Sequence, residues 1–240
     1  TIEIDTVAPV PVITGLTPGT DTGVSNTDGI TNLTSVMLYG TNVAHTGLQI
    51  QIDDGTPANL FNDDTAWGFS PSSLSEGAHT ATVIGYDSAG NESAPVTYHF
   101  TIDLTAPTNT PVIVGLSNDT DSGIKGDLFT NNPKFTLVGT AHAHQTVVIG
   151  LFLDQSSEIG RTVADQNGDW SFTLPENLSA DGNYEFLAGV MDDAGNPGIN
   201  TAATFVTLDT TPPAAPTVTL DPTRDRKSTR LNSSHLVISY

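Results

Sequence analysis

The chain has 240 residues, a net charge of −20 and no cysteine. Such a surplus of carboxylates repels nucleic-acid phosphates and anionic lipid, and the lack of cysteine excludes a disulfide framework. No apolar run approaches the roughly 20 residues that a membrane helix needs, so we expect neither a nucleic-acid partner nor membrane insertion.

The last segment of the chain, residues 225–240, resembles the conceptual translation of a short-read sequencing adapter. Four of the seven basic residues lie between positions 224 and 230, and the remaining three face 26 acidic residues in the rest of the chain. A basic cluster is otherwise typical of a tail that contacts nucleic acid or membrane, but the acidity of the rest argues against that interpretation. We expect residues 225–240 to be an adapter-derived artefact that is disordered.

An aspartate- and proline-containing motif occurs three times, each time after a short apolar segment. The copies are Asp5-Thr-Val-Ala-Pro9, Asp103-Leu-Thr-Ala-Pro107 and Asp209-Thr-Thr-Pro-Pro213. They begin 98 and 106 residues apart, about the length of one immunoglobulin-like β-sandwich. This spacing predicts the end of a preceding repeat at 1–4, repeat 1 at 5–102, repeat 2 at 103–208 and the start of a third repeat at 209–224.

Three further features recur in the same order within each repeat. They are an apolar strand followed by Asp-Thr-Gly or Asp-Ser-Gly (12–23 and 112–123), a Trp-x-Phe strand (67–69 and 170–172) and an Asp-x-Ala-Gly-Asn turn (87–91 and 192–196). Short alternating or β-branched runs between Gly, Asn, Asp and Pro predict strands, and no stretch has a helical stripe. We therefore predict an all-β fold of tandem immunoglobulin-like Greek-key β-sandwiches, each of about seven strands, arranged end to end.

Turn residues and aromatic residues refine this prediction. Asp53-Asp-Gly55 and Asn167-Gly168 accept positive φ, so each predicts a hairpin between neighbouring strands. The two aromatic residues of each Trp-x-Phe strand share one face of a sheet because they stand at alternate positions. We interpret them as core residues, and an exposed platform that stacks on sugars is the alternative.

Taken together, these motifs resemble the bacterial immunoglobulin-like repeats of giant, type I secreted, biofilm-associated adhesins. The resemblance covers residues 1 to about 220 and rests on four motifs in fixed order. It implies an extracellular stalk on a Gram-negative cell, with calcium near the junctions between repeats and adhesion to host or biofilm surfaces through other modules. The chain shows no initiating Met and no signal peptide, so we expect it to be a piece of a longer reading frame.

Sandwich topology indicates which aspartates meet at the junction between the two repeats. The loop after the first strand lies at the end where repeat 1 exits, and the hairpin between the last two strands of repeat 2 lies at its entry. Calcium takes about six to eight oxygen ligands in a tolerant geometry, and it removes the repulsion between clustered carboxylates. The candidate ligands at this junction are Asp21, Asp28, Asp103, Asp192 and Asp193.

Equivalent aspartates form incomplete sites at the two ends of the fragment. The upstream pair is Asp5 and Asp87, and the downstream set is Asp119, Asp121, Asp127 and Asp209. Repeat 1 has Gly19 where repeat 2 has Asp119, so its junction has one carboxylate fewer. The alternative interpretation is that all these aspartates only bond to amides of their own turns.

The sequence contains no motif of a catalytic centre: it has no Gly-x-Ser-x-Gly elbow, no phosphate-binding glycine loop and no His-Glu-x-x-His segment. We therefore expect no enzyme activity. The preferred function is that of a calcium-stiffened spacer, in contact with neighbouring repeats, which carries an adhesive tip. The alternative is a module that binds a glycan or a protein, or that accompanies a secreted enzyme.

Overall fold

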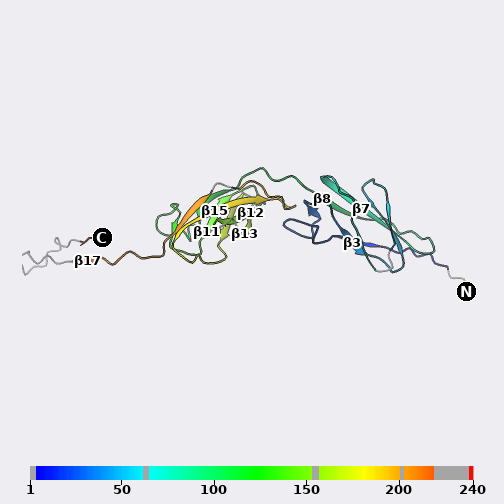
Figure 1. Ribbon diagram of the computed structural model, residues 1–240, viewed down its shortest axis with the longest axis horizontal. Helices are drawn as coiled ribbons and strands as arrows, with labels where there is room; N and C mark the ends of the chain where they lie inside the picture. Colours follow the sequence, from blue (N-terminus) through cyan, green and yellow to red (C-terminus); the bar gives the residue numbers. More distant parts are fainter. Residues whose placement is uncertain (1–3, 62–64, 153–156, 201–202, 219–237, 240) are drawn as a thin grey trace, which may run out of the picture.

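A computed structural model of the protein describes residues 4–61, 65–152, 157–200, 203–218 and 238–239. Two β-sandwiches follow one another along the long axis of the molecule (Figure 1). Every regular element in the described ranges is a strand, so none of them contains a helix that could cross a membrane. The predicted all-β fold of tandem immunoglobulin-like sandwiches is confirmed.

Repeat 1 packs a three-stranded sheet against a five-stranded sheet. The smaller sheet has the order β1 (Val12–Leu16), β3 (Leu38–Thr41), β6 (Ala66–Phe69). The larger has the order β2 (Ile30–Thr31), β8 (Val96–Ile102), β7 (Gly77–Tyr86), β4 (Gly47–Ile52), β5 (Ala58–Phe61). Strand β2 runs parallel to the end of β8, which places the loop before it beside the exit of the repeat.

Repeat 2 has the same arrangement. Its smaller sheet has the order β14 (Asp169–Thr173), β11 (Thr136–Thr140), β9 (Val112–Leu116). Its larger sheet has the order β10 (Phe129–Thr130), β16 (Thr204–Leu208), β15 (Gly182–Met191), β12 (Thr146–Phe152), β13 (Ser157–Val163). In both repeats, therefore, the loop before the short parallel strand, β2 or β10, lies beside the exit of the repeat.

Each repeat has its own hydrophobic core between its two sheets. Trp67 and Trp170 are only 5% and 4% exposed, which confirms that these residues pack in the core. Each indole crosses a neighbouring strand at a glycine, and a Cβ atom at Gly40 or Gly139 would lie only 2.6 or 2.2 Å from its ring. The cores share no residue, so each sandwich buries its apolar surface independently.

One of the two predicted hairpins is confirmed and the other is wrong. Asp53 has a φ of 49°, and the adjoining strands β4 and β5 pair antiparallel. The second turn is tight, with Gly168 N donating to Asp165 O at 3.0 Å, but β13 pairs with β12 whereas β14 pairs with β11. The chain crosses between sheets here because Trp170 and Phe172 belong to the inner face of the smaller sheet, where they pack on the core.

Two short strands lie beyond repeat 2. Strand β17 (Thr217–Val218) pairs antiparallel with β18 (Ile238–Ser239). The other residues of the segment predicted to be adapter-derived, 225–237 and 240, lie outside the described residues, as do 219–224 and 1–3.

Separate cores predict separate unfolding of the two repeats. Phe186 on β15 is fully buried and meets Phe135 edge to face at 5.6 Å, so Phe186→Ala is expected to destabilise repeat 2 by about 3–5 kcal/mol. Repeat 1 should keep its stability. Denaturant unfolding followed by NMR signals of each repeat measures both. Phe205→Ala, which removes the same group from a side chain that is 55% exposed, is the control. Equal losses in both repeats would contradict independent cores.

Candidate functional site at the junction between the repeats

Three segments converge where repeat 1 meets repeat 2, as the topology predicted. They are the loop of residues 17–29, the linker of residues 103–107 and the turn of residues 192–196 between β15 and β16. Asp103 N donates to Thr31 O at 2.9 Å, which holds the linker to repeat 1. Asn196 Nδ2 donates to Asp103 O at 2.8 Å, which holds the same residue to repeat 2. One linker residue is thus fastened on both sides.

The loop of repeat 1 also bonds directly to the turn of repeat 2. Val24 N donates to Asp193 O at 3.3 Å. The Thr22 hydroxyl lies 2.9 Å from Ala194 O, and it accepts a hydrogen bond from Asn32 N at 2.9 Å. Its single proton has three possible acceptors within reach: Ala194 O and Asn32 Oδ1, both at 2.9 Å, and Thr31 Oγ1 at 3.0 Å. The turn carbonyls therefore face polar hydrogens of the preceding repeat.

Two glycines allow this close approach. A Cβ atom on Gly23 would lie 1.9 Å from Asp193 O, and one on Gly195 would lie 2.9 Å from the Cα atom of Gly23. The backbones of the two repeats are therefore in contact, with no room for a side chain between them. Sequence reasoning used both glycines only as markers of the repeat. Their recurrence within the Asp-Thr-Gly and Ala-Gly-Asn motifs was the available signal.

Glu76 holds the linker from a second direction. Glu76 lies in the corner just before β7, and its Oε1 accepts a hydrogen bond from Thr105 Oγ1 of the linker. The equivalent corner of repeat 2 holds the next linker, because Asp181 accepts bonds from Thr210 N and from the hydroxyls of Thr210 and Thr211 at 2.7–2.9 Å. This contact recurs in both repeats, so it belongs to the repeat design.

Most of the predicted ligands at this junction bond to their own turns. Asp28 Oδ1 accepts from Ile30 N at 3.0 Å, and Asp103 Oδ1 accepts from Thr105 N at 2.9 Å. Asp192 accepts from Asn196 N at 2.7 Å and from Asn196 Nδ2 at 2.9 Å. Asp193 is exposed and meets repeat 1 through its carbonyl. In the part of the chain that the structure describes, no three acidic or imidazole side chains form a ready metal-binding group.

Asp21 differs from these residues because it is buried. It is 2% exposed; its Oδ2 accepts from Gly29 N at 3.2 Å, whereas its Oδ1 has no hydrogen-bond donor. Burial raises the pKa of Asp21, and the neighbouring carboxylate of Asp28 raises it further, against the opposing effect of the Gly29 bond. A buried oxygen without a donor beside a second carboxylate is an arrangement that a cation would stabilise.

The same buried residue recurs in repeat 2. Asp121 is 2% exposed, its Oδ2 accepts from Gly126 N at 2.6 Å, and its Oδ1 again has no donor. Here Lys125 reaches into the loop and donates to Asp121 O and Asn118 O. A fixed positive charge in this loop competes with a bound cation, so the loop of repeat 1 fits a cation better.

The other predicted end-site residues are turn residues. Asp5 accepts from Val7 N, Asp127 from Phe129 N and Asp209 from Thr211 N, each at 2.9–3.0 Å. Asp119 is exposed, with its own N within 3.4 Å of the Ser117 hydroxyl. The side chain of Asn91 lowers the pKa of Asp87 by bonding to its carboxylate, and the same amide donates to Asp5 O at 3.0 Å. The structure thus brings Asp5 and Asp87 into one turn assembly.

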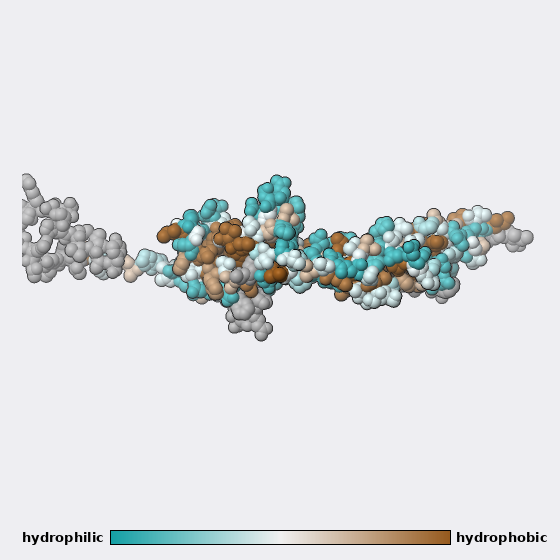
Figure 2. All heavy atoms as spheres, turned by 90° about the horizontal axis from the view of Figure 1, so that it is seen from above, coloured by the Kyte–Doolittle hydropathy of each residue, from teal (hydrophilic) through white to brown (hydrophobic). Residues whose placement is uncertain are grey.

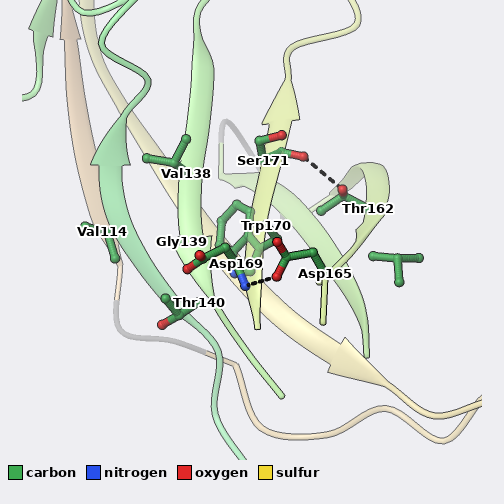
Figure 3. A pocket seen from close by; sticks show the side chains of 10 residues that line it. Val114, Val138, Gly139, Thr140, Thr162, Asp165, Asp169, Trp170 and Ser171 are labelled. Atoms are coloured by element: carbon green, nitrogen blue, oxygen red, sulfur yellow. Dashed lines mark hydrogen bonds between the residues drawn. The ribbon is translucent and has the colours of Figure 1, made fainter. Parts of the chain in front are cut away.

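A groove of about 620 Å³ lies on repeat 2, and its lining residues are distinct from those that make the junction contacts (Figure 3). Val114, Val138, Val163 and Trp170 are its apolar lining residues, and Asp165 and Asp169 are its acidic residues. Apolar side chains also gather over this repeat in Figure 2. A groove of this kind would serve a ligand-binding module.

The fold and the junction define a chain of immunoglobulin-like sandwiches in direct contact. The chain belongs to the bacterial Ig-like domain family, whose sequence profile matches residues 6–104 and 107–210. The two matched segments correspond to the two sandwiches. No curated protein matches the sequence.

Several solved structures are similar to the chain. The FN1–FN3 domains of chicken CNTN1 share 13% identity over 75% of this chain and 65% of that one, with a TM-score of 0.43. A 1.5-MDa bacterial ice-binding adhesin shares 20% identity over 85% and 65%, with a TM-score of 0.35. A tetra-tandem repeat from the extending region of a large adhesion protein shares 16% identity over 85% and 50%, with a TM-score of 0.29. The chain spans less than two thirds of each, and the likeness concerns the fold alone.

The glycine contact predicts a different response to the same substitution at two equivalent turns. Gly195→Ala places a methyl group against Gly23, so the repeats should separate and tumble more independently. Gly90→Ala is the matched control because Gly90 has a similar φ, 87° against 93°, and a Cβ atom there meets nothing within 4 Å. Both variants carry the same backbone strain of about 1–2 kcal/mol. Relaxation of ¹⁵N amides reports the tumbling of each repeat, and equal effects of the two variants would contradict the contact.

Proposed function

We propose that the two repeats act as a structural spacer of an extracellular protein, a stalk that holds another module away from a surface. The observation that carries this proposal is the direct contact of loop 17–29 with turn 192–196 across the junction, together with a linker fastened on both sides. Such a junction restricts rotation between the repeats, whereas domain interfaces inside a chain commonly allow relative motion. On the basis of the family resemblance, the proposal also includes an adhesive module at the tip of the stalk, type I secretion, and attachment to a host or biofilm.

The junction surfaces support a longer stack because both have copies at the free ends. The turn of residues 87–91 repeats the internal bonds of turn 192–196, and its Gly90 is open. Ser122 Oγ accepts from Asn131 N at 2.8 Å, as Thr22 Oγ1 accepts from Asn32 N, and Gly123 beside it is open. A head-to-tail contact of this kind can be repeated by the next unit, because each unit carries both of the surfaces that it needs.

Calcium at the junction is the second part of the proposal. Asp21 and Asp28 fit a cation, since they combine a buried oxygen that lacks a donor with a second carboxylate. Asp103 and Asp192 would complete the site from the linker and from repeat 2 with their remaining lone pairs. The ion would supply positive charge between segments that otherwise repel, and would stiffen a contact that hydrogen bonds already make.

The groove on repeat 2 favours a second candidate function, a module that binds a ligand. Its three valines offer apolar contact area, and the hydroxyl of Thr162, which donates to Ser171 O at 2.8 Å, fixes one wall. The spacer remains the preferred function because the junction contacts use features that recur in both repeats. We assign no catalytic step to the chain.

Small-angle X-ray scattering on the full chain, with excess calcium and then with a chelator, tests the spacer. Because the ion removes repulsion at the junction, we expect a particle with a longer maximum dimension and a narrower range of shapes when calcium is present. Asp28→Asn keeps the turn acceptor but removes a charge, so it should weaken calcium uptake in calorimetry by about tenfold or more. Asp169→Asn on the groove is the matched control.

The outcomes separate the two parts of the proposal. A stiff particle in both conditions, without calcium uptake, would retain the spacer and remove the ion. A flexible particle in both conditions would overturn the spacer, and the groove would become the first place to look for function.

A further inference from the structure

The corner before the second-to-last strand differs chemically between the two repeats. In repeat 2, Tyr184 stands near the start of β15 and its hydroxyl donates to Ala180 O at 2.7 Å. A tyrosine that bonds back to the backbone at this corner is common in immunoglobulin-like sandwiches. In repeat 1 the equivalent residue is His79, and its Nε2 lies 2.8 Å from Ser75 O. An imidazole thus replaces a phenol in the same structural bond.

His79 makes a second bond that Tyr184 does not make. Its Nδ1 lies 2.7 Å from Asp53 Oδ2, the ring is 7% exposed, and it stacks on Phe100 at 5.5 Å. A carbonyl oxygen and an ionised carboxylate oxygen only accept hydrogen bonds, so both ring nitrogens must carry a proton to satisfy them. The geometry therefore describes an imidazolium paired with a carboxylate at the edge of the core.

Among the described residues packed around the His79 ring, Asp53 is the charged partner of the imidazole. Asp53 Oδ1 also accepts from Thr80 N at 2.8 Å, so its carboxylate is fixed on both oxygens. Glu76 is engaged by Thr105. On the neighbouring strand β8, the Nδ1 of His99 lies 3.0 Å from the hydroxyl of Thr80, and Tyr98 stacks on the Phe100 ring at 6.2 Å.

Burial by itself would lower the pKa of His79, but its bonds to Asp53 and to Ser75 O and the charge of Asp53 outweigh burial and raise the pKa. For Asp53, burial is outweighed by the bonds from His79 and Thr80, and the pKa is lowered. A raised histidine pKa gives stability that is fully present below the unfolded value, about 6.5, and is lost as pH rises through the folded value.

We propose that His79 makes repeat 1 a pH-sensitive unit, which loses stability above neutral pH while repeat 2 does not. When the ring loses a proton, one of its two acceptors loses its donor inside the edge of the core. The Tyr184 corner makes the equivalent bond to Ala180 O with a hydroxyl group and contains no imidazole.

The place of this pair in the fold connects it to the junction. The His79 ring bonds to Ser75 O. The next residue, Glu76, accepts a hydrogen bond from Thr105 of the linker. Loosening of the corner therefore acts on the same linker that joins the repeats. This inference rests on contacts inside repeat 1 and does not depend on calcium.

Thermal unfolding of the full chain at about pH 6 and about pH 9, followed by NMR signals of each repeat, tests the proposal. From about pH 6 to about pH 9, the melting temperature of repeat 1 should decrease relative to that of repeat 2. Each unit by which the pKa of His79 is raised changes the unfolding equilibrium constant of repeat 1 by about tenfold. His79→Tyr introduces the tyrosine that repeat 2 has at this position, and it should abolish the pH-dependent difference in melting temperature between the repeats. It leaves the acidic surface of the chain unchanged, so general charge repulsion is controlled.

A direct measurement on the unmodified chain completes the test and needs no variant to fold. Imidazole ¹⁵N shifts of His79 should show both nitrogens protonated at pH 7, with a titration midpoint above that of an exposed histidine. Asp53→Asn should lower this midpoint. A His79 ring that is neutral at pH 7, or a repeat 1 midpoint that follows repeat 2 at both pH values, would overturn the inference.

Discussion

The backbones of the two repeats touch because Gly23 and Gly195 carry no side chain where they meet. This close approach lets Val24 N and the Thr22 hydroxyl reach the carbonyls of a turn in the next repeat. Without it, the linker alone would join two sandwiches whose cores share no residue. The end-to-end arrangement thus depends on a steric requirement at two positions, with hydrogen bonds added to it.

Side chains of aspartate and asparagine organise the ends of each repeat around that contact. Asp192 fixes Asn196 within the turn, and Asn196 then holds the linker at Asp103. Asp87, Asn91 and Asp5 repeat the arrangement at the entry of repeat 1. Turn formation and linker attachment therefore use the same residues, which explains why acidic turns recur along a chain that carries a net charge of −20. Buried Asp21 and Asp121 are the exceptions, because one oxygen of each carboxylate has no donor.

Much of the fold could be predicted from the sequence, because repeat spacing, strand alternation and the buried tryptophans follow from residue pattern. The convergence of loop, linker and turn was also predictable from sandwich topology. The hydrogen bonds of Val24 N and of the turn carbonyls were not, since backbone groups leave no signature in the sequence. The turn at Asn167-Gly168 resembled a hairpin, but core packing of Trp170 sends the following strand to the other sheet. Calcium at the predicted aspartates stays a prediction.

The central claim is that the two repeats hold one relative orientation through the junction contact. Residual dipolar couplings of backbone amides, measured on the full chain in a weakly aligning medium, test this most directly. A single alignment tensor should fit the couplings of both repeats, with the orientation that the contacts of Gly23 and Gly195 impose. Two tensors of clearly different magnitude would show that the repeats move independently and would contradict the account.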